Sequence, residues 1–268
     1  MDNNINHESR PLSNVVYWNQ FWSQMHKPIT IDTSNFRDYC CVNILKRKFV
    51  PGAKRFIEIG CGSGRYLVYF AREFGYEVWG IDNSEEAYSM AKMNLKYFKI
   101  EANLVKSDFL KLNLPKNHFD IVFSCGLFEH FDDPTAVLAK SLSLLKKGGQ
   151  IMTIVTNFGG LFGKIRKFIN PDIYEIHNPS APDCVLRAYH SLGLRNIESG
   201  YFGSLRLPVL NPNEIHSKKI PKKLIPLLRR GFNAFNIIAV YIYRKTGLQI
   251  NGKFFSSEFF VYGEKNRL

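Results

Sequence analysis

Residues 55–67, with the sequence RFIEIGCGSGRYL, decide the fold of this 268-residue chain. A short apolar run ends in three alternating glycines, and apolar residues at helical spacing follow at once. This order predicts a strand, a tight turn and the N-terminus of a helix. Glycine lets a ligand approach the main chain, and a helix N-terminus directs free N–H groups at the turn. We therefore expect a ligand-binding loop at the carboxyl end of a parallel strand, the alternative being a turn without a ligand.

The spacing of the glycines distinguishes two kinds of ligand. A dinucleotide fingerprint has the order G-x-G-x-x-G, but here the third glycine, Gly64, comes one residue early. Glu58 stands two residues before Gly60, where it would repel a pyrophosphate and suit a cationic ligand. The resulting pattern, E-x-G-x-G-x-G, resembles motif I of the class I S-adenosylmethionine-dependent methyltransferases.

Two later segments extend this resemblance. A second apolar run ends at Asp82, and an acid at this distance commonly accepts hydrogen bonds from ribose hydroxyls. The segment SCGLFEHF, residues 124–131, looks like the motif IV region of small-molecule methyltransferases of the quinone-biosynthesis kind. The resemblance covers residues 55–157 and implies S-adenosylmethionine as the cofactor.

The resemblance also implies the cofactor contacts. The glycine turn would lie against the methionine part and the sugar, Asp82 would bind the ribose, and Asp108 with the Phe109 backbone would meet the adenine. Tyr17 and Trp22 belong to an aromatic helix that either packs on the domain or covers the cofactor. The expected cofactor-binding residues are Glu58, Gly60, Cys61, Gly62, Gly64, Asp82, Asn83, Asp108, Phe109, Cys125, Gly126, Tyr17 and Trp22.

Strands and helices alternate between residues 58 and 157 as a doubly wound, mostly parallel α/β sheet requires. With the resemblance this predicts a seven-stranded Rossmann-like methyltransferase fold. We expect Met1 to Ser13 to be frayed and a helix from Asp132 to end at Gly148-Gly149, before a strand that begins at Gln150. The expected parts are an N-terminal helical cap (1–50), the Rossmann-like domain (51–202 and 253–268), a candidate lid (157–180) and a basic helical insertion (203–252).

Catalytic candidates follow the fourth strand. A sulfonium methyl is already electrophilic, so the protein mainly aligns the donor and acceptor and excludes water, with a base where the acceptor carries a proton. His130 is either that base or a structural hydrogen-bonding group, and Glu129 is its catalytic partner or a structural or cofactor-facing residue. Tyr174 and His177 in the candidate lid are expected to contact the substrate. The five cysteines show no CxxC spacing, so we expect free thiols and no metal site.

The net charge of +13 favours anionic partners, although it also serves solubility. Residues 205–253 hold ten cations against one acid. A helix over 217–246 would bind an anionic membrane surface, form a wall for an anionic acceptor, or pack on the core or on a second subunit. The absence of an N-P-P-[YF] signature makes nucleic acid a less favoured partner.

These features favour an enzyme that methylates an oxygen or nitrogen of a small-molecule acceptor, with an anionic, sugar- or lipid-linked acceptor as one option. The alternatives are an RNA methyltransferase and a non-catalytic S-adenosylmethionine-binding scaffold at a membrane or partner surface. The polar N-terminus, the free thiols and the absence of a spanning segment predict a cytoplasmic protein, peripheral to the membrane if the basic helix binds there.

Overall fold

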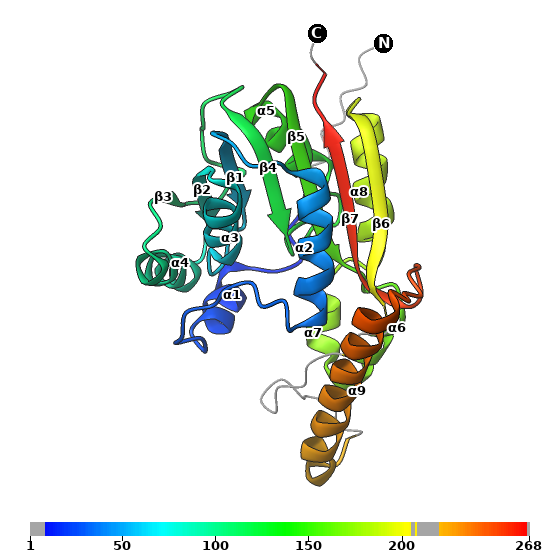
Figure 1. Cartoon of the computed structure of the whole chain (residues 1–268). Helices are drawn as coiled ribbons and strands as arrows, with labels where there is room; N and C mark the ends of the chain where they lie inside the picture. The colour runs from blue at the N-terminus through cyan, green and yellow to red at the C-terminus, as the bar shows by residue number, and fades with distance from the viewer. Residues whose placement is uncertain (1–8, 205–206, 208–219, 267–268) are drawn as a thin grey trace.

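The structure, a computed structural model, describes residues 9–204, 207 and 220–266. Its centre is a seven-stranded sheet in the order β3-β2-β1-β4-β5-β7-β6 (Figure 1). The strands are β1 Arg55–Ile59, β2 Glu77–Asp82, β3 Ala102–Lys106, β4 Phe119–Cys125, β5 Leu145–Thr156, β6 Arg195–Ser204 and β7 Ser256–Glu264.

The first five strands pair in parallel, whereas β7 runs antiparallel to both β5 and β6. From β1 the chain adds β2 and β3 on one side and then β4 and β5 on the other, so the strand order reverses between β1 and β4. The carboxyl ends of these two strands border the crevice where doubly wound sheets bind ligands. The mostly parallel, doubly wound sheet predicted from the sequence is confirmed.

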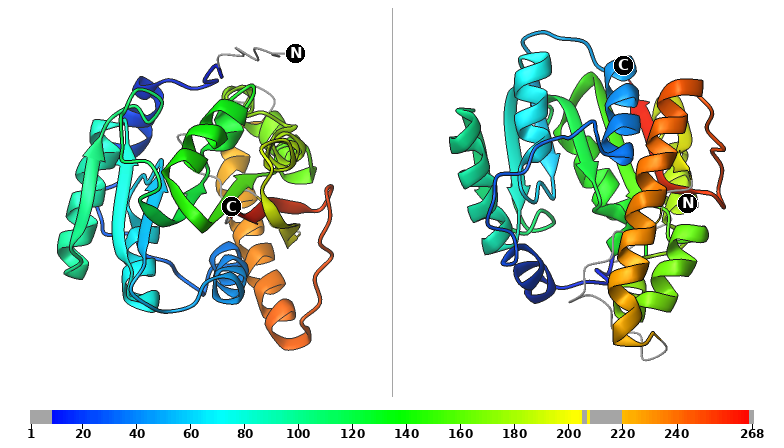
Figure 2. Two further views of the ribbon diagram at one scale, coloured as in Figure 1. Left: turned by 90° about the horizontal axis from the view of Figure 1, so that it is seen from above. Right: turned by 60° about the horizontal axis from the view of Figure 1, so that its bottom comes forward.

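Helices cover both faces of the sheet (Figure 2). The alternation of side chains along each strand supplies one core to α2 and α3 and a second core to α5 and α8. In β1, for example, Phe56 faces the first core and Ile57 the second. The α-helices are α1 Val15–Trp22, α2 Phe36–Lys48, α3 Arg65–Phe74, α4 Glu85–Phe98, α5 Thr135–Leu144, α6 Leu161–Ile169, α7 Pro171–Glu175, α8 Ala181–Ser191 and α9 Ile225–Thr246; two short 3₁₀ helices are η1 Phe128–His130 and η3 Lys222–Leu224.

The helix predicted to begin at Asp132 ends earlier than expected. α5 stops at Leu144 and β5 begins with the next residue, which pairs with Phe119 of β4. The register of this pair then shifts, and Gly148 takes a φ of 74° within the irregular stretch. The prediction that Gly148-Gly149 ends the helix, with a strand from Gln150, is therefore wrong, because Leu145 already pairs with Phe119 and an irregular stretch of the strand follows before Gln150 pairs with Ile121.

The N-terminal segment is ordered where the structure describes it. The N–H of Leu12 donates to the carbonyl of His130 over 2.7 Å, and the N–H of Arg10 donates to Asp132 Oδ1 over 2.8 Å. The expectation of a frayed segment is wrong for residues 9–13, because these bonds fix them beside the loop after β4. Residues 1–8 lie outside the described part of the chain.

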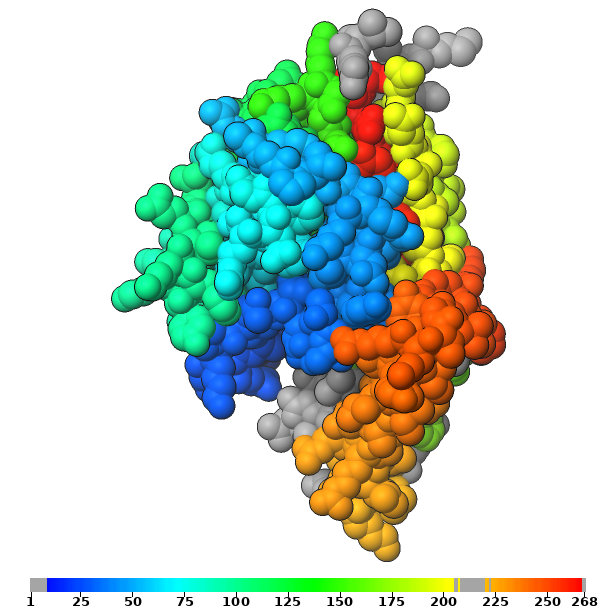
Figure 3. Space-filling view, viewed as in Figure 1, coloured from blue at the N-terminus to red at the C-terminus, as the bar shows by residue number. Residues whose placement is uncertain are grey.

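The basic insertion contains α9, a helix of 22 residues that extends past the lower end of the sheet (Figures 1 and 3). Ile225 is buried, and Tyr243 packs edge-on against Phe36 and Tyr39 of α2. Among the described residues, no helix is long and apolar enough to cross a membrane.

A buried ion pair connects α2 with the antiparallel side of the sheet. Arg37 Nε lies 2.7 Å from Glu258 Oε1 of β7, and Glu258 is only 1% exposed. Removing one member of a buried pair leaves a charge without its partner in a medium of low polarity.

Replacing Arg37 should therefore destabilise the fold. We expect Arg37→Met to lower the free energy of unfolding in urea by about 3–5 kcal/mol. The control is Lys46→Met on the same helix, which removes a solvent-exposed pair with Glu73 and should change this value by less than about 1 kcal/mol. Equal effects of the two substitutions would contradict this role of Arg37.

Candidate active site

The turn after β1 has the geometry that its glycines require. Gly60, Gly62 and Gly64 all have positive φ values, of 70°, 53° and 69°. The N–H of Gly60 donates to the carbonyl of Ile81 over 2.8 Å, and the N–H of Gly62 donates to Asp82 Oδ2 over 2.8 Å. The turn is thus held against the end of β2, and α3 begins directly after it.

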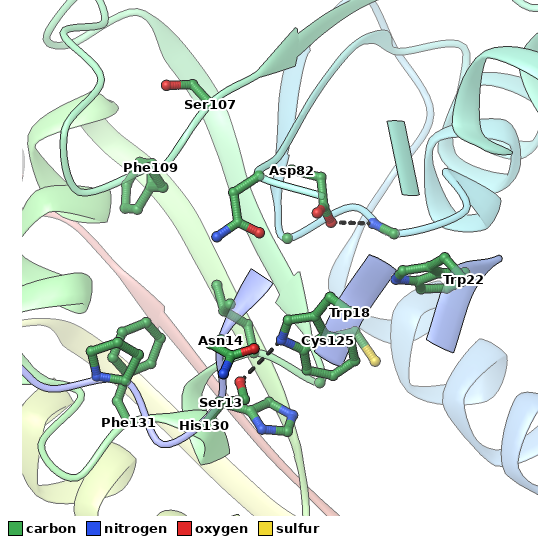
Figure 4. A pocket seen from close by; sticks show the side chains of 16 residues that line it. Ser13, Asn14, Trp18, Trp22, Asp82, Ser107, Phe109, Cys125, His130 and Phe131 are labelled. Atoms are coloured by element: carbon green, nitrogen blue, oxygen red, sulfur yellow. Dashed lines mark hydrogen bonds between the residues drawn. The ribbon is translucent and has the colours of Figure 1, made fainter. Parts of the chain in front are cut away.

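A cavity of about 160 Å³ opens at this turn. In Figure 4, Asp82, Ser107 and Phe109 lie on one side of it and Trp18, His130 and Phe131 on the other. The cavity thus lies at the carboxyl ends of the parallel strands, with the helix α1 and the loop after β4 closing the opposite side. Its lining residues are Pro11, Ser13, Asn14, Trp18, Trp22, Gly60, Gly62, Asp82, Asn83, Ser107, Phe109, Cys125, Gly126, Leu127, His130 and Phe131.

Asp82 is the acidic residue among those that line this cavity. Its Oδ1 accepts the N–H of Ser84 over 3.0 Å, while Oδ2 accepts that of Gly62. Burial raises the pKa of Asp82, and the N–H donors of Ser84, Gly62 and Asn83 oppose that rise. Each carboxylate oxygen retains acceptor capacity, which suits a ligand that carries hydroxyl groups.

The walls of the cavity bear on whether these residues fit S-adenosylmethionine. A Cβ on Gly62 would come within 2.5 Å of the Trp22 ring, so glycine is what allows Trp22 to lie against the turn at the wall of the cavity. Glu58 is 2% exposed, and its Oε2 has no hydrogen-bond partner among the described residues. Burial, with the neighbouring charge of Asp82, raises the pKa of Glu58 well above its usual value. An acid short of a partner beneath a glycine turn fits a cofactor that carries positive charge.

The structure brings most of the predicted cofactor residues to this cavity. Gly60, Gly62, Asp82, Asn83, Phe109, Cys125, Gly126 and Trp22 line it. Glu58, Cys61 and Gly64 lie within the strand and turn behind it and do not line it. Asp108 does not line it either: its Oδ1 accepts the N–H of Leu110 over 3.0 Å, as in a turn, while its two neighbours in the chain face the cavity.

A second cavity, of about 600 Å³, adjoins the first. Both are lined by Trp18, Gly126 and His130, which mark where the two cavities meet. Aromatic side chains, three arginines and three carboxyl groups line the second cavity: Tyr17, Trp18, Phe21, Met25, Asn35, Arg37, Asp38, Arg65, Gly126, Glu129, His130, Thr156, Phe158, Phe162, Arg166, Ile173, His177 and Glu258.

Glu129 presents an unsatisfied carboxyl oxygen in this second cavity. Its Oε1 accepts the N–H of Thr156 over 2.8 Å, but its Oε2 has no hydrogen-bond partner among the described residues. The residue is 1% exposed, and burial raises its pKa to about 7. A carboxyl group with this pKa exchanges its proton near neutral pH, where a general base is most effective.

His130 and His177 are held as neutral rings. His130 Nδ1 lies 2.8 Å from the carbonyl of Ile176, and His177 Nδ1 lies 2.5 Å from that of Ile173. Because a carbonyl only accepts, each Nδ1 carries the proton and each Nε2 keeps its lone pair. Burial lowers the pKa of His130 to about 4 and that of His177 well below its usual value.

The aromatic contacts of these rings join the candidate lid to the loop after β4. The centroids of the His130 and His177 rings lie 4.2 Å apart, and the Phe158 ring stacks on the His177 ring with 3.8 Å between their centroids. Tyr17 lines the second cavity rather than the first, and Tyr174 lines neither. Roles for these residues in binding cofactor or substrate stay predictions.

Sequence reasoning missed several residues of both cavities. Trp18 lies one position from Tyr17 on the aromatic helix, and helical spacing alone did not distinguish them. Arg37 and Glu258 of the second cavity are 221 positions apart, so no local pattern brings them together.

Comparisons with known proteins agree with this geometry. Residues 57–153 match the family described as "Methyltransferase domain". The ubiquinone biosynthesis O-methyltransferase of Stutzerimonas stutzeri is 30% identical over 118 residues, which cover 43% of this chain and 50% of that protein. Phosphoethanolamine N-methyltransferase 3 of Arabidopsis thaliana is 31% identical over 102 residues, or 38% of this chain and 21% of that protein. The chain spans about half the length of the ubiquinone relatives that it matches.

Solved structures show the same fold. A SAM-dependent methyltransferase from Archaeoglobus fulgidus matches 83% of this chain and 92% of its own with a TM-score of 0.55 and 22% identity. Phosphoethanolamine N-methyltransferase 2 from Haemonchus contortus, solved with phosphomonomethylethanolamine and S-adenosylhomocysteine, matches 84% of this chain and 52% of its own, with a TM-score of 0.56 and 19% identity.

The sheet order and the family match over residues 57–153 agree with a class I S-adenosylmethionine-dependent methyltransferase domain. The named relatives methylate acceptors of different chemistry, one at oxygen and one at nitrogen. S-adenosylmethionine is the cofactor of the family, and the resemblance seen in the sequence is confirmed.

The raised pKa of Glu129 has a measurable effect on stability. A carboxyl whose pKa is higher in the folded state stabilises the fold fully below the unfolded value of 4.5, and this contribution is lost as the pH rises through about 7. Glu129→Gln keeps an oxygen for the Thr156 N–H and removes the charge. Relative to this variant, the native chain should lose up to about 3 kcal/mol of unfolding free energy between pH 4.5 and 8.

The control is Asp120→Asn, for which the effect has the opposite sign. Burial alone would raise the pKa of Asp120, but its bonds with Lys146 and the Arg55 N–H hold that pKa below its usual value. The native chain should therefore gain stability over this second variant as the pH rises. Parallel pH profiles for the two variants, from denaturant titrations, would contradict the placement of Glu129.

Proposed function

We propose that the chain transfers a methyl group from S-adenosylmethionine to an oxygen or nitrogen of a small-molecule acceptor. The observation that carries this proposal is the pair of adjoining cavities. One lies on the glycine turn, the other is lined by Glu129, whose Oε2 has no hydrogen-bond partner among the described residues, and Trp18, Gly126 and His130 line both.

The residues that would hold the cofactor are those of the first cavity. Asp82 would accept hydrogen bonds from the ribose hydroxyls, and Glu58 would offset the positive charge of the methionine part. Phe109 and Leu127 would supply apolar surface for the adenine ring, because both line the cavity. When bound, the cofactor supplies an electrophilic methyl group, so the chain's own task is to orient the acceptor and to exclude water.

The chain's chemical role is to accept a proton from the acceptor. Glu129 Oε2 is the first candidate base, because it is buried, lines the second cavity and belongs to a carboxyl with a pKa of about 7. His130 is a weaker base, since its pKa is about 4, but its Nε2 can accept a hydrogen bond and orient the acceptor. We therefore assign removal of the proton to Glu129 and positioning to His130.

The lining of the second cavity supports an acceptor with an aromatic or apolar body. Tyr17, Phe21, Phe158 and Phe162 provide the flat apolar walls. The three arginines are matched by three carboxyl groups, so the proposal of an anionic acceptor, sugar- or lipid-linked, rests on the net charge of +13. Tyr174 and His177 stay proposed substrate contacts, and 157–180 stays a proposed lid.

Binding of S-adenosylmethionine tests the first cavity. Asp82→Ala should weaken binding measured by calorimetry by about tenfold or more, because the variant loses a charged acceptor for hydroxyl groups. Glu77→Ala is the control, because Glu77 lies at the opposite end of the same strand, where it pairs with Arg55. An unchanged dissociation constant for Asp82→Ala, or tighter binding of NAD than of S-adenosylmethionine, would rule out the proposed site.

Turnover tests the second cavity. With methyl-labelled S-adenosylmethionine and a panel of hydroxylated aromatic acids and amines, Glu129→Gln should lower kcat by about 10²–10⁴-fold for an acceptor that must lose a proton. The native rate should rise as the pH increases through about 7, where Glu129 loses its proton, and this step should vanish in the variant.

Two further variants separate positioning from general damage. His130→Gln should raise KM more than it lowers kcat, because its role is orientation. His118→Gln, at the amino end of β4 and outside both cavities, should leave both constants unchanged. A kcat for Glu129→Gln equal to that of the native chain across the pH range would exclude Glu129 as the base.

A further inference from the structure

α9 leaves an apolar face open to solvent. Residues 225, 240 and 243 lie on its packed side, whereas Leu227, Ile238 and Tyr241 share the opposite stripe at about 3.6 residues per turn. These three side chains are 67%, 57% and 63% exposed. Ile237, next to the stripe, is 69% exposed. Isolated exposed apolar residues are ordinary, but a continuous stripe of them marks a surface that binds something.

The apolar surface continues past the end of the helix. Leu248, Ile250, Phe254 and Phe255 are each between 41% and 64% exposed. An apolar cavity of about 250 Å³ lies among the same elements, lined by Phe36, Ser204, Phe235, Ile238, Ala239, Ile242, Tyr243, Leu248 and Ile250. The exposed side of α9 and residues 248–255 thus form one surface, which we call the α9 surface.

The segment that forms the α9 surface carries charge of one sign, although Asp183 of α8 pairs with one of its cations, Lys253. Residues 220–257 contain no aspartate or glutamate and hold seven cations, which are Lys222, Lys223, Arg229, Arg230, Arg244, Lys245 and Lys253. Arg229 and Arg230 fall in the first two turns of α9 and Arg244 and Lys245 in its last turn, so cations lie near both ends of the helix that carries the apolar stripe. A second copy of this chain would bring cations against cations, whereas an anionic surface would attract them.

We propose that the α9 surface docks on the headgroup region of an anionic lipid bilayer. The apolar stripe would enter the boundary between headgroups and acyl chains, and the arginines and lysines would contact lipid phosphates. RNA offers the phosphates but no apolar phase for Leu227 and Ile238, so it fits only half of the surface.

The docked orientation would place the bilayer near the second cavity, where we propose that the acceptor binds. α9 extends past the same end of the sheet at which α1, α6 and α7 lie (Figure 1), and α1 and α6 both contribute residues to that cavity. Phe168 of α6 is itself 53% exposed. Only this step, the delivery of a membrane-held acceptor, rests on the proposed methyl transfer, because docking itself does not need it.

Sedimentation with vesicles tests the docking. The full chain should bind vesicles of phosphatidylcholine and phosphatidylglycerol at least about tenfold more tightly than pure phosphatidylcholine, and added salt should remove the difference. Ile238→Asp should weaken this binding about tenfold or more. Val50→Asp is the matched control, because Val50 is 63% exposed and lies between α2 and β1, outside the α9 surface. The double variant Arg229→Gln/Arg230→Gln should weaken binding about tenfold.

Several outcomes would overturn the proposal. These are no preference for phosphatidylglycerol, equal effects of the two Asp substitutions, a lipid-free dimer that Ile238→Asp dissociates, or tighter binding of a single-stranded RNA probe than of the vesicles. Circular dichroism confirms that each variant is folded. S-adenosylmethionine binding is measured on the native chain and on the same variants. A native chain that binds S-adenosylmethionine but not the anionic vesicles rejects only this inference, and one that binds the vesicles but not S-adenosylmethionine rejects only the proposed function.

Discussion

The carboxylate of Asp82 holds the candidate active site together. It accepts one N–H from the turn after β1 and another from the start of α4, so a single side chain connects the first two strand-to-helix turns. With Gly62 drawn toward the end of β2, the glycine turn bends away from the first cavity and leaves main-chain surface open to it. The same carboxylate faces the cavity, and therefore shapes the turn and offers acceptor oxygens to a ligand.

The two cavities treat charge in different ways. At the first, Asp82 lines the cavity and Glu58 lies buried behind it; burial raises both pKa values and makes added positive charge favourable. In the second, burial keeps His130 and His177 neutral while Glu129 titrates near pH 7. Burial thus acts on neighbouring residues of one loop in opposite directions, because it always disfavours whichever form is charged.

Much of the fold could be predicted from the sequence because its signals are local. The glycine turn, the acid that ends β2 and the alternation of strands and helices each follow from a few adjacent residues. The end of α5 could not be predicted, because pairing of Leu145 with Phe119 overrides the helical spacing and the usual meaning of Gly148. Asp108 likewise fitted the expected position of an adenine contact, yet its carboxylate accepts the N–H of Leu110 within its own turn. The walls of the second cavity include residues of α1, α2, α6 and β7, and only the folded chain shows that these elements meet.

The pairing of Ser204 with Ser256 makes β6 and β7 a hairpin whose connection, residues 205–255, enters and leaves the sheet at one point. A connection between directly paired ends can grow or shrink with little effect on the strands, since the entropy of closing a loop rises only slowly with its length. Seven residue pairs define the register of the hairpin. This corner of the sheet can therefore carry a long segment such as α9 without interrupting the strands on either side of it.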